Sequence, residues 1–446
     1  MGPAMGWQSA RTLALCWLTV PLASAAAAPG QGFDVERYGV TLRPDLATTA
    51  VSGIETIEVR ATADGVTQLA FTANALTISE ATADAAPIAI ASGPDGIRFT
   101  LPRALRRGQR ATLRFRMAGT PARGILRLPG GALATSYFAC DWMVCLQDAP
   151  GDKAHLSLDL LLPDGVESIA VGRGRRATRA DGLTLHRWRS TRPYSPYLYA
   201  FAAGRFARSA VRTPGGDLLY LDGTGGGVDL PALFARSPDI AAFLAGKAGM
   251  PLPDRRYAQL LVPGEEAQES ASASLIGAAE LRAERAGDPA STWIIAHEMA
   301  HRWWGNLVTC ATWRDFWLNE GITTFMVAAW KEQAFGPEGY RQELDVARRR
   351  VARLREIGFD KPLAWGGRYP SLGARRGVQY SKGALFLAHL RETIGDDAFW
   401  AGLRGFTRRH AGGTVTSRDF QRAMEAASRR DLSPLFAEWV YGESGD

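Results

Sequence analysis

The segment from His297 to Glu320 combines residue types whose spacing suits metal chemistry. His297 and His301 are four residues apart, so on a helix both imidazoles project from one face and reach a single ion. Glu298 stands beside such an ion, in the position of a general base. Glu320 follows His301 after eighteen intervening residues and supplies a third ligand. Two imidazoles, one carboxylate and an open position for water are the ligands of a catalytic zinc site, which predicts one Zn²⁺ per chain.

Two helices must hold these ligands in place. The first is expected to begin after Asp288, a good N-cap, and to end before Gly305, a residue that favours helix termini. An amphipathic pattern from Thr312 to Phe335 predicts the second, which stops at the Gly-Pro pair that follows. A turn between them folds the second helix back on the first and brings Glu320 level with the histidines.

The remaining sequence divides into a β-rich part and a helix-rich part. From Gly32 to about Phe206, short runs of Val, Ile, Thr and Leu alternate with Gly, Pro and Asp turns, which predicts an antiparallel sandwich or saddle-shaped sheet. The clearest strand patterns are Thr56–Arg60, Gln68–Phe71, Leu76–Glu80, Ile97–Leu101, Ala111–Phe115 and Leu156–Leu162.

The second part begins after a Gly- and Asp-rich segment, Thr213–Gly227, which we interpret as a turn inside a connection. A helix is expected at Leu230–Ala248, and strands at Tyr257–Val262 and Leu275–Leu281. Helical patterns dominate from there on. The fold class is therefore α+β, with more than one domain.

The N-terminus has the pattern of a secretory signal peptide. Arg11 precedes an apolar run from Thr12 to Leu22, and small residues follow at a typical cleavage site, so residues 1–28 are expected to be removed and the protein exported to the periplasm or secreted. The run is short for a membrane span, so no stable membrane anchor is expected, with a retained anchor as the alternative. The net charge of +7 comes from scattered arginines, which argues against a nucleic-acid partner.

Three cysteines, Cys140, Cys145 and Cys310, follow the signal peptide. The first two are close enough in sequence to form a small-loop disulfide in an oxidising compartment, which would leave Cys310 unpaired. Three buried free thiols are an equally good interpretation.

Further motifs extend the pattern beyond the metal residues. They are Trp304–Thr309 and Trp317–Gly321 around the ligands, Tyr380–Ala384 (Tyr-x-Lys-Gly-Ala), Gln147–Pro150 and the strand-like segment Ser195–Phe206. With these motifs the chain resembles the M1 family of zinc aminopeptidases over nearly its whole mature length. The family's short Asp-x-Pro motif corresponds to Gln147–Pro150.

The resemblance implies an N-terminal antiparallel β sandwich or saddle domain at residues 29–208, followed by a mainly helical, thermolysin-like zinc peptidase domain at 209–446. It implies removal of N-terminal amino acids from peptides that have a free N-terminus. Glu298 would take a proton from the attacking water, and Tyr380 would donate a hydrogen bond to the oxyanion. Gln147 is expected to contact the substrate. We make no prediction of the oligomeric state.

Two departures from the family matter. Family members carry Gly-Ala-Met-Glu-Asn before the zinc helix, and its glutamate holds the substrate's α-amine, but this pentapeptide is absent here. Glu269, twenty-eight positions before His297, is our preferred candidate for that role, whereas Glu280 lies only seventeen positions before it. The second departure is length, since the chain stops near Gly442, about where the family's catalytic domain ends. We therefore expect no C-terminal helical domain over the site.

Two other functions compete with this interpretation. A zinc endopeptidase, or a hydrolase of another small substrate, would keep the metal site without using Glu269 as an amine anchor. An inactive binding protein would have lost a ligand or the base, and neither is lost in this sequence.

Overall fold

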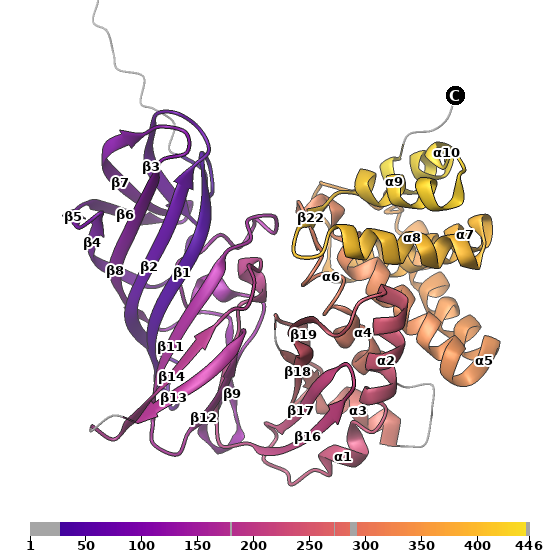
Figure 1. The fold of residues 1–446 in the computed structure, drawn as a ribbon, viewed down its shortest axis with the longest axis horizontal. Coiled ribbons are helices and arrows are strands. Elements are labelled where there is room, and N and C mark those ends of the chain that lie inside the picture. Colours follow the sequence, from indigo (N-terminus) through magenta and orange to yellow (C-terminus); the bar gives the residue numbers. More distant parts are fainter. Residues whose placement is uncertain (1–26, 179–180, 272, 286–291, 443–446) are drawn as a thin grey trace, which may run out of the picture.

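In the computed structural model, residues 27–178, 181–271, 273–285 and 292–442 are described. Figure 1 shows a β-rich half and a helix-rich half side by side. Nearly all of the predicted signal peptide, and the predicted N-cap Asp288, lie outside the described residues. Within those ranges, no helix combines the length and the hydropathy needed to span a membrane.

The β-rich half is built on an eight-stranded sheet with the order β13-β14-β11-β1-β2-β8-β4-β5. Its strands are β1 (Phe33–Pro44), β2 (Val51–Ala61), β4 (Thr77–Ala83), β5 (Ala86–Pro87), β8 (Arg110–Gly119), β11 (His155–Pro163), β13 (Arg173–Thr178) and β14 (Leu183–Arg189). Neighbouring strands are antiparallel except for β1 and β11, which are parallel. In β8, alternate residues from Ala111 to Met117 are buried, as expected for a strand with one face on the core.

Two smaller sheets complete this half. One has the order β3-β7-β6 and the other β12-β15-β10-β9. The strands are β3 (Val66–Phe71), β6 (Ala89–Gly93), β7 (Gly96–Leu105), β9 (Ile125–Leu128), β10 (Ala132–Thr135), β12 (Glu167–Ala170) and β15 (Phe201–Gly204). All six strand patterns that we selected from the sequence overlap with strands, namely β2, β3, β4, β7, β8 and β11.

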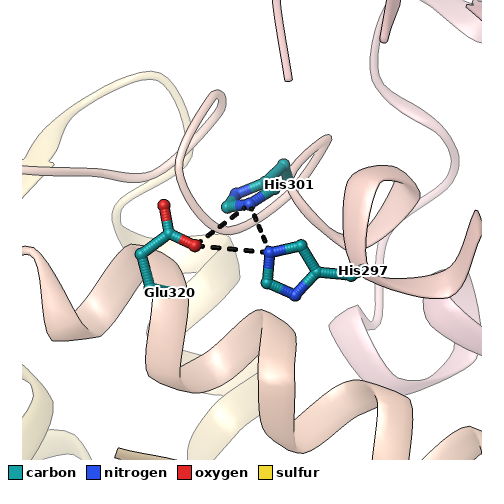
Figure 2. Close-up of side chains that lie close together, drawn as sticks. All are labelled: His297, His301 and Glu320. Carbon is teal, nitrogen blue, oxygen red and sulfur yellow. Dashed lines mark hydrogen bonds and ion pairs between the residues drawn. The ribbon is translucent and has the colours of Figure 1, made fainter. Parts of the chain in front are cut away.

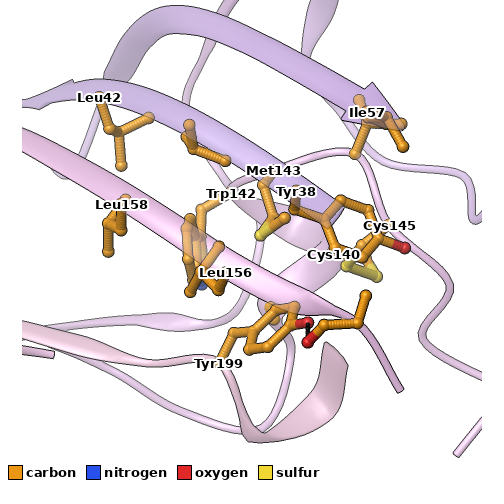
Figure 3. Packing of buried hydrophobic residues seen from close by; sticks show 14 of the residues in the cluster. Tyr38, Leu42, Ile57, Cys140, Trp142, Met143, Cys145, Leu156, Leu158 and Tyr199 are labelled. Carbon is orange, nitrogen blue, oxygen red and sulfur yellow. Dashed lines mark hydrogen bonds between the residues drawn. A yellow bond between two sulfur atoms is a disulfide. The ribbon is translucent and has the colours of Figure 1, made fainter. Parts of the chain in front are cut away.

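The core of this half contains a disulfide between Cys140 and Cys145, whose Cα atoms are 5.0 Å apart (Figure 3). It lies among buried aromatic residues, including Tyr38 and Trp142. Of the two interpretations that the sequence left open, the structure has the disulfide. Cys310 is free and buried.

The helix-rich half starts with a five-stranded sheet, ordered β16-β17-β18-β20-β19. Its strands are β16 (Ala207–Thr213), β17 (Gly216–Asp222), β18 (Arg256–Val262), β19 (Ala267–Glu269) and β20 (Ala273–Gly277). The expected turn at Thr213–Gly227 is therefore wrong in part, because β17 runs through it. The strand expected at Leu275–Leu281 ends at Gly277, where α3 (Ala278–Arg285) begins. The predicted domain boundary falls within β16, and its position stays a prediction.

Helices make up most of the rest of this half (Figure 1). They are α1 (Leu230–Leu233), α2 (Ser237–Ala248), α4 (Trp293–Ala300), α5 (Trp317–Glu356), α6 (Leu372–Arg375), the π-helix η7 (Arg376–Lys382), α7 (Gly383–Ile394), α8 (Asp396–Arg409), α9 (Ser417–Ser428), α10 (Ser433–Phe436) and the π-helix η8 (Ala437–Tyr441). The single helix expected at Leu230–Ala248 is split, because Pro238 fits only the first turn of a helix. A short parallel pair, β21 (Thr309–Cys310) with β22 (Thr414–Val415), links the metal region to the last helices.

The long helix α5 is interrupted at Gly336, whose φ of +78° and ψ of −175° are not helical. The predicted stop at the Gly-Pro pair is thus a real break, after which helical structure resumes. The predicted α+β fold class, with a β domain before a mainly helical domain, is confirmed.

Candidate functional site

Two elements carry the three predicted metal ligands. His297 lies in α4, and His301 caps the end of this helix, which stops earlier than the sequence suggested. Glu320 lies in the first turn of α5. Almost every residue of α4 is buried, so the helix is fixed on all sides and its ligands have little freedom.

The three ligand atoms form a nearly equilateral triangle (Figure 2). The Nε2 atoms of His297 and His301 are 3.2 Å apart, and Oε2 of Glu320 lies 3.3 Å and 3.4 Å from them. A tetrahedral ion with ligands at ~2.0–2.1 Å requires edges of about 3.3–3.4 Å. The ligand atoms therefore already stand at the separations that zinc requires.

A hydrogen bond to the backbone orients His301. Nδ1 of His301 donates a hydrogen bond to the carbonyl oxygen of Trp304 at 3.0 Å, which leaves its Nε2 as the lone-pair donor for a metal. Gly305 allows this close turn: its φ is +119°, and a Cβ at this position would lie 2.7 Å from that Nδ1. Glycine in the motif that follows the histidines is thus required by the geometry of His301.

The charges in the site favour a cation. Burial lowers the pKa of His297, so that its imidazole is neutral and able to bind a metal. Burial alone would raise the pKa of Glu320, but the two histidines hold it well below its usual range. Burial opposes protonation of His301, yet Glu320 and other carboxylates raise its pKa to about 10. A metal ion supplies the positive charge that these carboxylates favour.

Glu298 lies next to the ligand triangle and belongs to a second group with Glu269 and His301, whose nearest ligand atoms are all within 4.8 Å of one another. Its side chain is buried, and among the described residues its Oε2 has no hydrogen-bond partner. Burial and the neighbouring Glu269 raise the pKa of Glu298 well above its usual range. A carboxylate with a raised pKa and a free oxygen is suited to accept a proton.

Glu269 reaches this group from the last position of β19, an edge strand of the five-stranded sheet. Its side chain is buried, Nε2 of Gln268 donates a hydrogen bond to its Oε2 at 2.6 Å, and burial raises its pKa to about 7. Glu280 lies in α3 and belongs to neither metal-competent group found among the described residues. Of the two candidates, the structure brings Glu269 to the site.

Tyr380 lies in η7, beside the ligands. Its ring is stacked on that of His297, with centroids 5.9 Å apart and an angle of 11° between planes. Burial and the charge of Glu320 raise the pKa of Tyr380 well above 10, so its hydroxyl stays protonated and can donate a hydrogen bond.

Gln147 does not join the group. Its Nε2 donates to the carbonyl oxygen of Tyr137 at 2.9 Å, and its Oε1 accepts from the backbone nitrogen of Cys140 at 3.3 Å. The side chain is buried. These bonds favour a role in holding Tyr137 over the predicted contact with substrate.

Two residues that hydrogen-bond to the segment just after His301 were not predicted from the sequence. Both come from the β-rich half. The Nζ of Lys153 donates to the carbonyl oxygens of Asn306 and Leu307, at 3.3 Å and 3.0 Å. The hydroxyl of Tyr197 donates to the carbonyl oxygen of Gly305 at 3.3 Å. No local pattern could reveal these contacts, because the partners are more than a hundred residues apart in sequence.

Comparison with known proteins covers both halves of the chain. Residues 273–439 match the family model described as the Peptidase family M1 domain. Aminopeptidase N of Streptomyces lividans is 31% identical over 198 residues, which are 42% of this chain and 23% of the relative. Leukotriene A-4 hydrolase of Xenopus laevis is 24% identical over 439 residues, covering 90% of this chain and 69% of the relative.

The fold also matches solved structures. The crystal structure of a mutant M1 zinc metallopeptidase from Deinococcus radiodurans, bound to a Tyr-Ser-Ala substrate, has a TM-score of 0.76 with 23% sequence identity, over 94% of this chain and 96% of that one. A related structure is described as a two-domain M1 zinc metallopeptidase. At 23% identity this similarity concerns the fold, and it extends over both halves of the chain.

The chain spans only 23%, 18% and 19% of the lengths of three curated aminopeptidase relatives that it matches. The matched segment nevertheless contains the three predicted metal ligands, Glu298 and Tyr380. A one-zinc cofactor is what this family of peptidases uses, as predicted. The matched segment, the triangle of predicted ligands within it and the shared two-domain fold lead to one conclusion: residues 273–439 form a peptidase family M1 domain.

Proposed function

We propose that this protein is a zinc aminopeptidase that removes N-terminal amino acids from peptides. The observation that carries the proposal is the buried carboxylate of Glu269, within 4.8 Å of the nearest ligand atoms of Glu298 and His301. A free α-ammonium group placed there would neutralise a carboxylate that is costly to bury unpaired. An endopeptidase has no need of such a group beside the scissile bond.

The residues of the chain divide the chemistry among them. His297, His301 and Glu320 would hold the metal. The chemistry supplied by zinc in this position is the lowering of a water's pKa toward ~7 and the polarisation of the scissile carbonyl. Glu298 accepts the proton of the attacking water at its free Oε2 and passes it to the leaving amine. The hydroxyl of Tyr380 donates a hydrogen bond to the oxyanion.

A panel of aminoacyl chromogenic substrates tests this function. The protein loaded with zinc should hydrolyse them, a chelator should abolish the hydrolysis, and added zinc should restore it. An N-acetylated peptide should be a poor substrate, because it lacks the ammonium group that pairs with Glu269. Equal cleavage of acetylated and free peptides would instead support the zinc endopeptidase.

We further propose that the protein is exported and acts in the periplasm or outside the cell. The signal pattern in residues 1–28 supports this, and so does the disulfide between Cys140 and Cys145, since disulfides persist mainly in oxidising compartments. Cell fractionation, with N-terminal sequencing of the mature protein, tests the proposal. A cytoplasmic protein with an intact N-terminus would contradict it.

A further inference from the structure

A cavity of about 190 Å³ lies between the two halves of the protein, and the proposed mechanism does not use it. Strands β12, β13 and β14 of the β-rich half line one side, and β16, β17 and β18 of the helix-rich half line the other. The described residues that line it include no predicted metal ligand and neither Glu269, Glu298 nor Tyr380. The cavity is therefore separate from the catalytic centre.

His186 in β14 is the most buried polar residue of this cavity, with 1% of its surface exposed. Its Nδ1 lies 2.8 Å from Oγ of Ser168, and the same oxygen accepts a hydrogen bond from Nε1 of Trp188 at 2.9 Å. Among the described residues, the hydroxyl proton of Ser168 has no acceptor other than Nδ1 of His186. Nδ1 therefore accepts, and Nε2 carries the proton of the neutral ring.

Nε2 of His186 is buried and has no hydrogen-bond partner in the part of the chain that the structure describes. Burial and the nearby charge of Arg176 lower the pKa of His186, so the ring stays neutral at pH 7 and Nε2 remains a hydrogen-bond donor. A buried donor without an acceptor is unfavourable, and few occur in folded proteins. An acceptor atom of a ligand in the cavity would satisfy it.

The charges around the cavity favour a negatively charged ligand. Four arginines line it, two from each half: Arg175, Arg176, Arg208 and Arg256. Glu167 is the acidic residue among the described lining, and its Oε1 is shared by Arg176 at 3.7 Å and Arg208 at 3.6 Å. Arg256 forms no ion pair with any described residue. An anion would supply the negative charge that these guanidinium groups lack.

The rest of the wall is apolar. It consists of Ile169, Trp188, Phe206, Leu219 and Leu221. Binding sites for small molecules commonly combine such a surface with a few polar groups that fix the orientation of the ligand. An inorganic ion would leave this surface uncovered, whereas an organic ligand with an apolar body would bury it.

We propose that this cavity binds a small organic anion, whose acidic group accepts a hydrogen bond from Nε2 of His186 and pairs with Arg208 and Arg256. The apolar body of the ligand packs against Trp188. Because the arginines come from both halves, the bound anion reduces the repulsion between like charges across the junction. The inference goes beyond the proposed aminopeptidase function, since the residues of this cavity take no part in that chemistry.

The test uses benzoate, phenyl phosphate, inorganic phosphate and benzamide, a neutral molecule of nearly the same shape as benzoate. Calorimetric titration at low salt should give a Kd about tenfold lower for benzoate than for benzamide, because only the anion pairs with the arginines. Phenyl phosphate should bind more tightly than inorganic phosphate, because it also covers the apolar wall. Equal affinities within either pair, or no binding of the two organic anions, would overturn the proposal.

Two substitutions locate the binding. His186→Met removes the buried donor and should raise the Kd of benzoate about tenfold. Arg256→Gln removes an exposed charge and should raise it at least about threefold. Since Arg256 lies at the surface, this variant tests the site even if His186→Met does not fold. Unchanged affinity in Arg256→Gln would place the anion elsewhere, for instance at the metal, and would contradict the site.

Arg187→Gln is the matched control. Arg187 follows His186 in β14, is exposed, and is not among the described residues that line the cavity, as expected for neighbours on opposite faces of a strand. The substitution removes the same charge as Arg256→Gln, so the Kd of benzoate should stay as in the unaltered protein. An equal loss of affinity in both variants would indicate a general effect of net charge and would contradict a specific site.

Discussion

The rings of His297 and Tyr380 lie nearly parallel, with 5.9 Å between centroids and 11° between planes. A metal ligand thus supports the ring whose hydroxyl we assign to the oxyanion. The stacking depends on the ring and not on the hydroxyl, so the two contributions can be separated by mutation.

Tyr380→Phe removes the hydroxyl and keeps the ring. Zinc content should stay at one ion per chain, while kcat should fall by about 10²–10³, because the lost hydrogen bond forms only in the transition state. Steady-state kinetics with metal analysis on the same sample checks both parts. An unchanged kcat would remove Tyr380 from the mechanism.

Glu298→Gln tests the base. The amide has nearly the same shape but cannot accept a proton, so turnover should drop by about 10²–10⁴ while zinc is retained. Loss of zinc in this variant would mean that Glu298 helps to hold the metal.

Glu320→Ala should lose zinc, because two histidines remain as ligands and the carboxylate that opposes the charge of the metal is gone. Dialysis against metal-free buffer followed by elemental analysis measures the loss. Glu280→Ala is the matched control, since its carboxylate lies outside both metal-competent groups and its zinc content should not change. Full occupancy in the Glu320 variant would refute the assigned ligand set.

Glu269→Ala should raise KM and lower kcat/KM by about 10², since a buried ammonium group would lose its partner. Zinc content should be unaffected. The N-acetylated substrate should gain nothing from the mutation, as it has no ammonium group to lose. If Glu280→Ala produced this pattern instead, the amine anchor would lie in α3.

Lys153 gives a prediction about pH and stability. Burial lowers the pKa of Lys153 from 10.5 to about 7 in the folded protein. Between about pH 7 and 10 the unfolded chain therefore carries a proton that the folded protein lacks, so this group makes the free energy of unfolding rise with pH across that window.

Lys153→Met removes that contribution, so the Tm of this variant should rise less, or fall more, between pH 7 and 10 than the Tm of the unaltered protein. Lys361→Met is the control, because Lys361 makes cation–π contacts with Phe359 and Trp365 instead of bonding the metal region. Parallel Tm curves for Lys153→Met and the unaltered protein would show that Lys153 is not buried in its neutral form.

The metal triad could be predicted from sequence because its spacing is local. His297 and His301 are one helical turn apart, and a helix followed by a return helix leaves few positions for Glu320. The six β-domain strands were predictable for the same reason, as alternation along a strand with one buried face is visible in a short window. The stop at Gly336 followed from the conformational freedom of glycine.

The rest depended on contacts that no short window contains. Strand β17 was taken for a turn because glycines and aspartates surround its short apolar run, although Leu218 and Tyr220 alternate in burial with Asp217 and Leu219. Spacing favoured Glu269 over Glu280, but the position of its carboxylate near His301 depends on the fold of β19 against β20. The hydrogen bonds that the side-chain amide of Gln147 makes likewise exist only in the folded chain.

The hydroxyl of Tyr197 connects the β-rich half to the helix-rich half by two hydrogen bonds. It accepts a hydrogen bond from Nδ2 of Asn319 at 3.1 Å while it donates to Gly305, so one side chain from the β-rich half joins the segments just beyond His301 and just before Glu320. The halves are therefore not exchangeable modules. A helical half excised at residue 207 would keep every metal ligand yet lose the tether that fixes the distance between them. Any recombination of this fold with a foreign β domain must bring an equivalent tyrosine to preserve metal affinity.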